Sequence, residues 1–226
     1  MKWTAAMLAL AAAVGLTALA ADVAPTATAP TPKVVPVSWQ LDFEYQAPQP
    51  ITIRLPGRSQ AETFWYMLYS VANRTGADQG FFPSFDMYTD TGKVVRSDGA
   101  GVPTGAFLAI QKRHNDPLLM NMVDIRGKLL QGEDNGKRGV AIWPDFDHDA
   151  RKIDIFISGL SGERESVKLP VPGTETIVDE DGKPKQVAKT VVVLSKTLKL
   201  SYAVSGEAAS RTAASPKKVE ETWVMR

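Results

Sequence analysis

The stretch FWYMLYSVANRTGADQGFFPSFDMYTDTG, Phe64 to Gly92, holds much of the aromatic content of this 226-residue chain. In an extended strand, successive side chains point to opposite faces. One face of its first part then carries Phe64, Tyr66 and Leu68, and the other carries Trp65, Met67, Tyr69 and Val71. A strand that is apolar on both faces lies centrally, with a core on one side and a second layer or a partner on the other. We therefore interpret the aromatic run as core, with a ligand platform as the alternative.

Turn-forming residues divide this stretch into strands. The segment Asn73 to Gly76, NRTG, ends the first strand, because Asn and Gly adopt left-handed backbone angles more readily than other residues. A second strand is predicted from Phe81 to Thr89, closed by the turn Asp90-Thr91-Gly92. Asn73-Arg74-Thr75 also matches the N-glycosylation pattern, but a turn is the preferred interpretation of these residues.

Alternation of apolar and polar residues predicts further strands on both sides of the aromatic run. Upstream, residues 39–45 and 51–55 alternate in this way, and the turn Pro48 to Pro50 between them predicts a hairpin. Downstream, the segments Gly139 to Phe146 and Ile153 to Ile157 are predicted strands.

The last third of the chain predicts a second hairpin and a long strand. Asp181-Gly182, within Val171 to Lys185, is a strong hairpin turn pair. A long strand follows from Val192 to Val204, and Lys196 alone interrupts its apolar face. A final strand contains Val219, Trp223 and Val224.

One segment, Pro103 to Asp116, has helical spacing, with Thr104 as the expected cap. The apolar segment Leu118 to Val123 has no clear period and remains unassigned, either packed inside or exposed as a surface for a partner. Many strands, turn chemistry between them and one helix predict a mainly β fold. We expect an antiparallel immunoglobulin-like sandwich with one short helix inserted near residues 104–115.

Composition excludes several classes of protein. The 26 Lys and Arg residues balance 25 Asp and Glu residues, so no overall positive field attracts nucleic acid, and we expect no nucleic-acid partner. The chain has no cysteine, which excludes disulfides, a thiol nucleophile and Cys-ligated metal sites. A packed core must therefore hold the fold.

The N-terminal region predicts export. Residues 1–20 join Lys2 to an apolar run that ends in Ala18-Leu19-Ala20, which supplies the small residues that signal peptidase requires at the −3 and −1 positions. We interpret them as a cleaved signal peptide; the alternative is a retained anchor, the one case in which a membrane is a partner. Residues 21–36 are rich in Ala, Pro and Thr and predict a semi-extended tether. A single sandwich domain is expected over residues 37–226.

The aromatic run, together with GKLLQGEDNGKRGVAIWPDFD and ISGLSGE, resembles an uncharacterised family of exported bacterial proteins. In that family an aromatic strand ends in V-x-N-x-T-G, here Val71 to Gly76, before a strand of form F-x-P-x-F, here Phe81 to Phe85. More loosely, these turns and the G-x-A-I-W strand, Gly139 to Trp143, look like bacterial immunoglobulin-like extracellular domains. The resemblance implies the fold of most of Val37 to Arg226 and carries no catalytic set.

The sharpest polar cluster is WPDFDHDARKID, where Asp145, Asp147 and Asp149 occupy every second position. Such oxygen ligands are candidates for calcium, but Ala150 replaces the Gly that a calcium loop needs, so an acidic turn is the preferred interpretation. Trp143 beside these aspartates is a candidate sugar platform. For hydrolysis, only His114 and His148 are available as bases, and GLSGE does not match the nucleophile elbow.

These observations favour an exported, non-enzymatic β-sandwich that binds another protein or an envelope component through its loops or an exposed strand edge. No cofactor is expected. The alternative is a carbohydrate-binding module or hydrolase that uses the loop with Trp143, Asp145, Asp147 and Asp149. The expected location is the periplasm or the outside medium.

Overall fold

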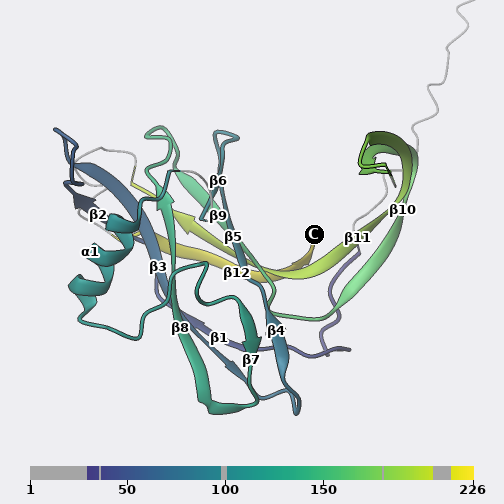
Figure 1. The fold of residues 1–226 in the computed structure, drawn as a ribbon, viewed down its shortest axis with the longest axis horizontal. Helices are drawn as coiled ribbons and strands as arrows, with labels where there is room; N and C mark the ends of the chain where they lie inside the picture. Colours follow the sequence, from purple (N-terminus) through teal and green to yellow (C-terminus); the bar gives the residue numbers. More distant parts are fainter. Residues whose placement is uncertain (1–29, 36, 98–100, 180, 206–214) are drawn as a thin grey trace, which may run out of the picture.

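The computed structural model of the chain describes residues 30–35, 37–97, 101–179, 181–205 and 215–226. Within them, antiparallel sheets and a single helix confirm the predicted mainly β class (Figure 1). The elements are β1 (Asp42–Tyr45), β2 (Gln49–Ile53), β3 (Glu62–Asn73), β4 (Gln79–Phe81), β5 (Ser84–Thr89), β6 (Val94–Arg96), α1 (Thr104–His114), β7 (Gly127–Leu129), β8 (Gly132–Pro144), β9 (Lys152–Ser158), β10 (Arg164–Val178), β11 (Pro184–Ala203) and β12 (Lys217–Met225).

The predicted signal peptide, residues 1–20, and residues 21–29 of the predicted tether lie outside the described residues. Within the described part of the chain, the helix is too short and too polar to cross a membrane.

The first sheet is built around β3, the aromatic strand. β8 pairs with β3 along one side, while β1 and β2 pair with it one after the other along the other side. The predicted hairpin between residues 39–45 and 51–55 is therefore wrong. The chain continues in one direction because the Gln46 N–H still bonds the Leu68 carbonyl at 2.9 Å, and Pro48, which has no N–H, only interrupts the ladder.

The second sheet is built around β11, which is 20 residues long. β9 and then β10 pair with one side of β11, while β12 pairs with the other side, from Lys196 to Ala203. β5 and β6 extend the sheet beyond β9. The hairpin predicted at Asp181-Gly182 is confirmed, and Gly182 has the positive φ of 77° that this turn requires.

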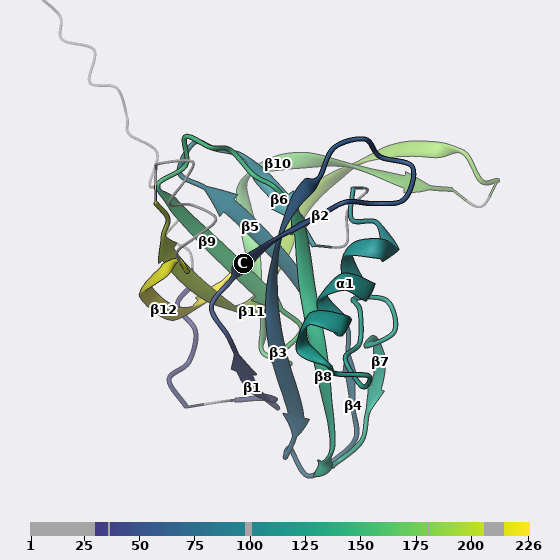
Figure 2. The same cartoon turned by 90° about the vertical axis from the view of Figure 1, so that its left-hand side faces the viewer.

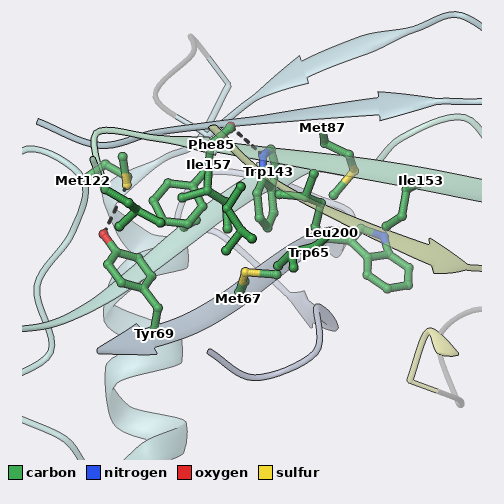
Figure 3. Close-up of a cluster of buried hydrophobic side chains, with 14 of the residues drawn as sticks. Trp65, Met67, Tyr69, Phe85, Met87, Met122, Trp143, Ile153, Ile157 and Leu200 are labelled. Atoms are coloured by element: carbon green, nitrogen blue, oxygen red, sulfur yellow. Dashed lines mark hydrogen bonds between the residues drawn. The ribbon is translucent and has the colours of Figure 1, made fainter. Parts of the chain in front are cut away.

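The main core lies between the two sheets, and α1 covers the outer face of the first sheet (Figure 2). Trp65, Met67 and Tyr69 point into the main core, where Figure 3 shows them beside Phe85 and Trp143. The opposite face of β3 packs under α1, with these buried side chains: Phe64, Tyr66, Ala106, Ile110, Val140 and Ile142. The interpretation of the aromatic run as core is thus confirmed, because each face of β3 has its own covering layer.

The helix and the turn after β3 differ in detail from the predictions. Thr104 is the first helical residue and not the cap; Pro103 occupies the cap position without a side-chain hydrogen bond. Asn73 does not have a left-handed backbone, and its amide side chain organises the turn instead. The strand predicted from Phe81 to Thr89 breaks at Phe82-Pro83 into β4, which pairs with β7, and β5.

Candidate functional site

Trp143 lies inside the core and not on the surface. Its side chain is fully buried, its Nε1 donates a hydrogen bond to the Phe85 carbonyl at 3.2 Å, and its ring meets the Phe85 ring edge to face. A sugar platform requires an exposed aromatic face. The alternative function based on Trp143 therefore lacks the surface on which it depends.

The three aspartates that follow β8 make contacts with different residues. Asp145 Oδ1 accepts a hydrogen bond from Trp65 Nε1 at 2.9 Å, which links the loop to the core. Asp147 accepts the backbone N–H of Asp149 at 3.1 Å and lies 3.2 Å from Lys93 Nζ. That N–H, followed by contacts from Thr91 and Lys93, holds the pKa of Asp147 below its ordinary value. The described residues bring no three His, Asp or Glu side chains together in a way that could hold a metal ion.

The two histidine rings contact a tyrosine and an aspartate, and neither is hydrogen-bonded to a serine among the described residues. The His114 ring at the end of α1 shares a 2.9 Å hydrogen bond with the Tyr66 hydroxyl, and burial, followed by the charge of Arg113, lowers the pKa of His114. His148 is exposed and lies 3.7 Å from Asp145. Ser161, in GLSGE, donates to the Trp39 carbonyl.

Asn73 in the N-R-T segment is fully buried and bonded through both ends of its amide. Its Nδ2 donates to the Ala77 and Leu129 carbonyls, each at 2.9 Å. Its Oδ1 accepts from the Thr75 N–H at 3.1 Å and the Thr75 hydroxyl at 2.8 Å. The segment thus serves as a structural turn that also fastens β7 to the end of β3.

We expect Asn73→Ala to lower the free energy of unfolding by about 2 to 3 kcal/mol, because it leaves the buried Leu129 carbonyl without a donor. Urea denaturation of the purified variant measures this loss. Thr75→Ala, which removes a more exposed hydroxyl, should cost about 1 kcal/mol or less. Equal losses in the two variants would contradict the central role of the amide.

The unassigned segment Leu118 to Val123 divides between core and surface. Leu119 and Met122 are buried, while Leu118 and Val123 are 70% and 74% exposed. Met120 forms a bridge to Gly139 of β8. The segment is therefore neither wholly packed inside nor wholly exposed, because buried and exposed side chains are interspersed along it.

The most distinctive feature of the structure is a long two-stranded arm, residues 164–178 of β10 with residues 184–195 of β11. It extends away from the sandwich and curves back at its tip (Figures 1 and 2). No residue of β10 is buried. Val171 and Val193 are 74% and 58% exposed, although valine is normally a core residue. The arm therefore offers backbone edges and apolar side chains to a partner.

The outer edge of β11 in the arm has no partner strand among the described residues. At the root of the arm, Ser195 exchanges two hydrogen bonds with Arg226, the last residue of the chain, at 2.7 and 3.0 Å. Lys196 donates in the opposite direction, to the Glu163 carbonyl. Backbone groups alternate in direction along a strand, so Val193 and Val191 present their N–H and C=O groups outward. Beyond the bulge, nearer the tip, the Asp179 N–H donates to the Lys183 carbonyl at 2.9 Å, so Lys185, Val187 and Lys189 face β10, and Gln186 and Ala188 face outward.

The other edge of the arm, which belongs to β10, is protected from pairing in a different way. β10 contains a bulge between Lys168 and Gly173, where Pro170 and Pro172 lie. Prolines and bulges are the usual means by which an exposed edge avoids pairing. β11 carries no proline between Lys185 and Ser195. Of the two edges, that of β11 is thus the one able to accept another strand.

The arm is anchored at its root by a buried ion pair. Lys196 Nζ lies 3.2 Å from Glu163 Oε2, and the two side chains are 3% and 7% exposed. The Lys33 N–H donates to Glu163 Oε1 at 2.9 Å, and Lys196 Nζ also lies over the Trp223 ring, 5.3 Å from its centre. The interruption that Lys196 makes in an apolar pattern was the sequence signal for this site.

No family model, no curated protein and no solved structure matches this chain. The immunoglobulin-like assignment and the resemblance to exported bacterial proteins therefore stay predictions. The candidate site rests on the geometry of the arm alone. The sequence pattern predicted the hairpin turn of the arm and marked Lys196, but it did not indicate that the arm projects or that its β11 edge is free.

Proposed function

We propose that this protein is an exported, non-enzymatic binding module that captures an extended segment of another protein on the outer edge of β11. The observation that carries the proposal is the unpaired edge from Val193 to Lys185, which begins where the pairing of β12 with β11 stops. A strand added there would continue the line of β12. Main-chain hydrogen bonds then supply affinity, and alternate side chains supply specificity.

The side chains beside this edge indicate the character of the partner. Val191 and Val193 share one face of the arm and are 42% and 58% exposed. Lys185 and Lys189 lie nearer the tip, beyond the bulge of β10. A complementary segment carries aliphatic residues at one end and an acidic residue at the other.

A second copy of the chain fits this edge less well. A symmetric antiparallel pairing of two copies about the middle of this edge places Lys189 directly opposite Lys189 of the other copy. Like charges at opposed positions destabilise a sheet.

The export part of the proposal rests on the sequence, namely on residues 1–20 and the absence of cysteine.

The edge variant Val191→Pro tests the proposal, because it removes one outward N–H and leaves the ladder to β10 intact. We expect it to reduce capture of the partner from an envelope extract by at least about tenfold. Val193→Lys should act similarly, whereas Val171→Lys, the same change at an exposed valine on the opposite strand, should not.

Amide hydrogen exchange on the captured complex gives the decisive readout. In the free protein, the outward amides of Gln186, Ala188, Val191 and Val193 should exchange faster than those of Val187, Lys189, Val192 and Leu194, which face β10. Partner binding should slow the four outward amides. Capture that is equal in Val191→Pro and Val171→Lys, or protection without this alternation, would overturn strand addition, and a concentration-dependent dimer with the same protection would replace the partner by a second copy.

A further inference from the structure

A cavity of about 280 Å³ lies between the start of α1, the segment that follows the helix, and the outer face of β8. It is remote in sequence from the arm and independent of the function proposed for it. Figure 2 shows α1 lying along β8, two of the elements that supply its walls. An apolar cavity of about 150 Å³ is enough to hold benzene, so this one has room for a molecule of roughly twice that size.

The apolar wall of the cavity comes from the helix, the sheet and the segment after the helix. Phe107 of α1 packs against the cluster that contains Val140 and Ile142 of β8, and all three residues line the cavity. Met122, from the segment after α1, lines it as well and belongs to the main core. Hydrocarbon atoms of a ligand would therefore have van der Waals contacts on more than one side.

One buried hydroxyl in the lining lacks a partner. Ser97 is 4% exposed, and its Oγ makes no hydrogen bond with any described residue. Buried hydroxyl groups normally have a partner, because leaving the bond unmade costs free energy. An oxygen atom of a bound molecule would supply the partner that the protein does not.

Two other polar side chains of the lining are already engaged. Asn121 Oδ1 accepts the N–H groups of Val123 and Asp124 at 2.8 and 2.9 Å, and Asn121 Nδ2 donates to the Asp124 carboxylate at 2.6 Å. Arg126, the only charged residue among the described ones that line the cavity, has an interaction of its own within the protein. A charged ligand would therefore lose its hydration without gaining an unengaged opposite charge. The lining favours a neutral molecule.

The start of α1 favours a hydrogen-bond acceptor on that molecule. Thr104, the first residue of the helix, lines the cavity, and Pro103 at the cap position supplies no side-chain hydrogen bond. The first N–H groups of a helix lack intrahelical acceptors. The Ser97 hydroxyl can also donate. An acceptor that brings no charge, such as a carbonyl oxygen, suits both.

We propose that this cavity binds a small neutral carbonyl compound, a ketone or ester that is apolar over most of its surface. Its carbonyl oxygen accepts a hydrogen bond from the Ser97 hydroxyl, and its hydrocarbon part lies against Phe107 and Ile142. Because the carbonyl group is neutral, binding leaves no ion buried beside the apolar wall.

NMR titration of the purified chain with 2-acetylnaphthalene, an aromatic ketone, tests the proposal. We expect saturable shifts of the methyl signal of Met122, which lines the cavity, and an unchanged signal from Met87, which lies in the main core outside the lining. The charged analogue 2-naphthoate should bind at least about tenfold more weakly. Absence of saturable binding, or equal affinity of the ketone and the carboxylate, would overturn the proposal.

Ser97→Ala tests the hydrogen bond separately from folding. It should weaken the ketone about three- to tenfold and leave unchanged the affinity for 2-isopropenylnaphthalene, a hydrocarbon in which CH₂ replaces the carbonyl oxygen. The melting temperature of the free variant should be unchanged or higher, because the hydroxyl that it loses has no partner. An equal change for both compounds, or unchanged ketone affinity, would overturn the role of the hydroxyl.

Two variants of α1 locate the apolar part of the site. Phe107→Ala removes a half-buried ring from the lining and should weaken the ketone at least about tenfold. Leu108→Ala, at the next position, truncates a side chain that is 54% exposed and outside the lining, and it should leave the affinity unchanged. Circular dichroism checks that both variants are folded, and equal loss in the two would contradict the assigned site.

Discussion

Trp143→Ala should lower the free energy of unfolding by about 4 kcal/mol, as expected for removing a large aromatic side chain from a packed core. Trp143 is fully buried near the end of β8 and contacts the facing sheet through Phe85. The truncation would leave a cavity between the two sheets. Urea denaturation followed by far-ultraviolet circular dichroism measures the loss.

Trp223→Ala is the matched control for this experiment, because Trp223 is half-buried on β12. We expect it to cost less than half as much. A Trp143→Ala protein as stable as Trp223→Ala would contradict the core position of Trp143 and would restore the sugar-platform hypothesis.

Lys196→Met should cost about 3 kcal/mol or more, since it leaves the Glu163 carboxylate buried without its cation. Methionine keeps the aliphatic stem, so the loss reports the charge and not the packing. The double variant Lys196→Met with Glu163→Leu should recover much of the stability, because no unpaired charge then remains. Urea denaturation of the three proteins provides the comparison, and a double variant less stable than Lys196→Met would contradict this account.

The same pair predicts an acid dependence of stability. The Lys33 N–H, followed by the contact with Lys196, lowers the pKa of Glu163 below its ordinary value of 4.5. The unfolded chain then binds this proton more readily than the folded chain. The contribution is present above pH 4.5 and is lost as the pH falls through the lowered folded value. Glu163→Gln should remove this part of the pH profile, and an unchanged profile would contradict it.

The sequence predicted those parts of the fold that depend on local alternation and turn chemistry. The two apolar faces of β3 predicted a central strand with a core on one side and a second layer or a partner on the other, and the structure has a second layer. Asp181-Gly182 predicted a hairpin, and each of these signals is complete within a few residues. The connection from β1 to β2 was predicted wrongly. Whether β1 and β2 form a hairpin or pair in line with one long strand depends on β3, which is long enough to pair with both. The residues around Pro48 carry no information about the length of β3.

The candidate sites were harder to predict because they depend on where segments that are distant in the sequence lie relative to one another in the fold. The run Val191 to Val193 has the pattern of a core strand, yet no second sheet reaches it, and a pattern cannot reveal that. The cavity joins Ser97, Thr104 and Arg126 to β8, residues that only the folded chain brings together. Trp143 shows the opposite error. Its position just before three aspartates suggested a sugar-binding surface, but its side chain is buried in the core.

The continuity of β11 also has a mechanical consequence. One strand runs from the tip of the arm into the sandwich, where β9 and β12 hold it on both sides. A partner that pulls on the arm along its length would load the perpendicular hydrogen bonds of these two ladders in shear, so that many must break together. The arm is therefore suited to carry tension between a captured protein and the body of the fold.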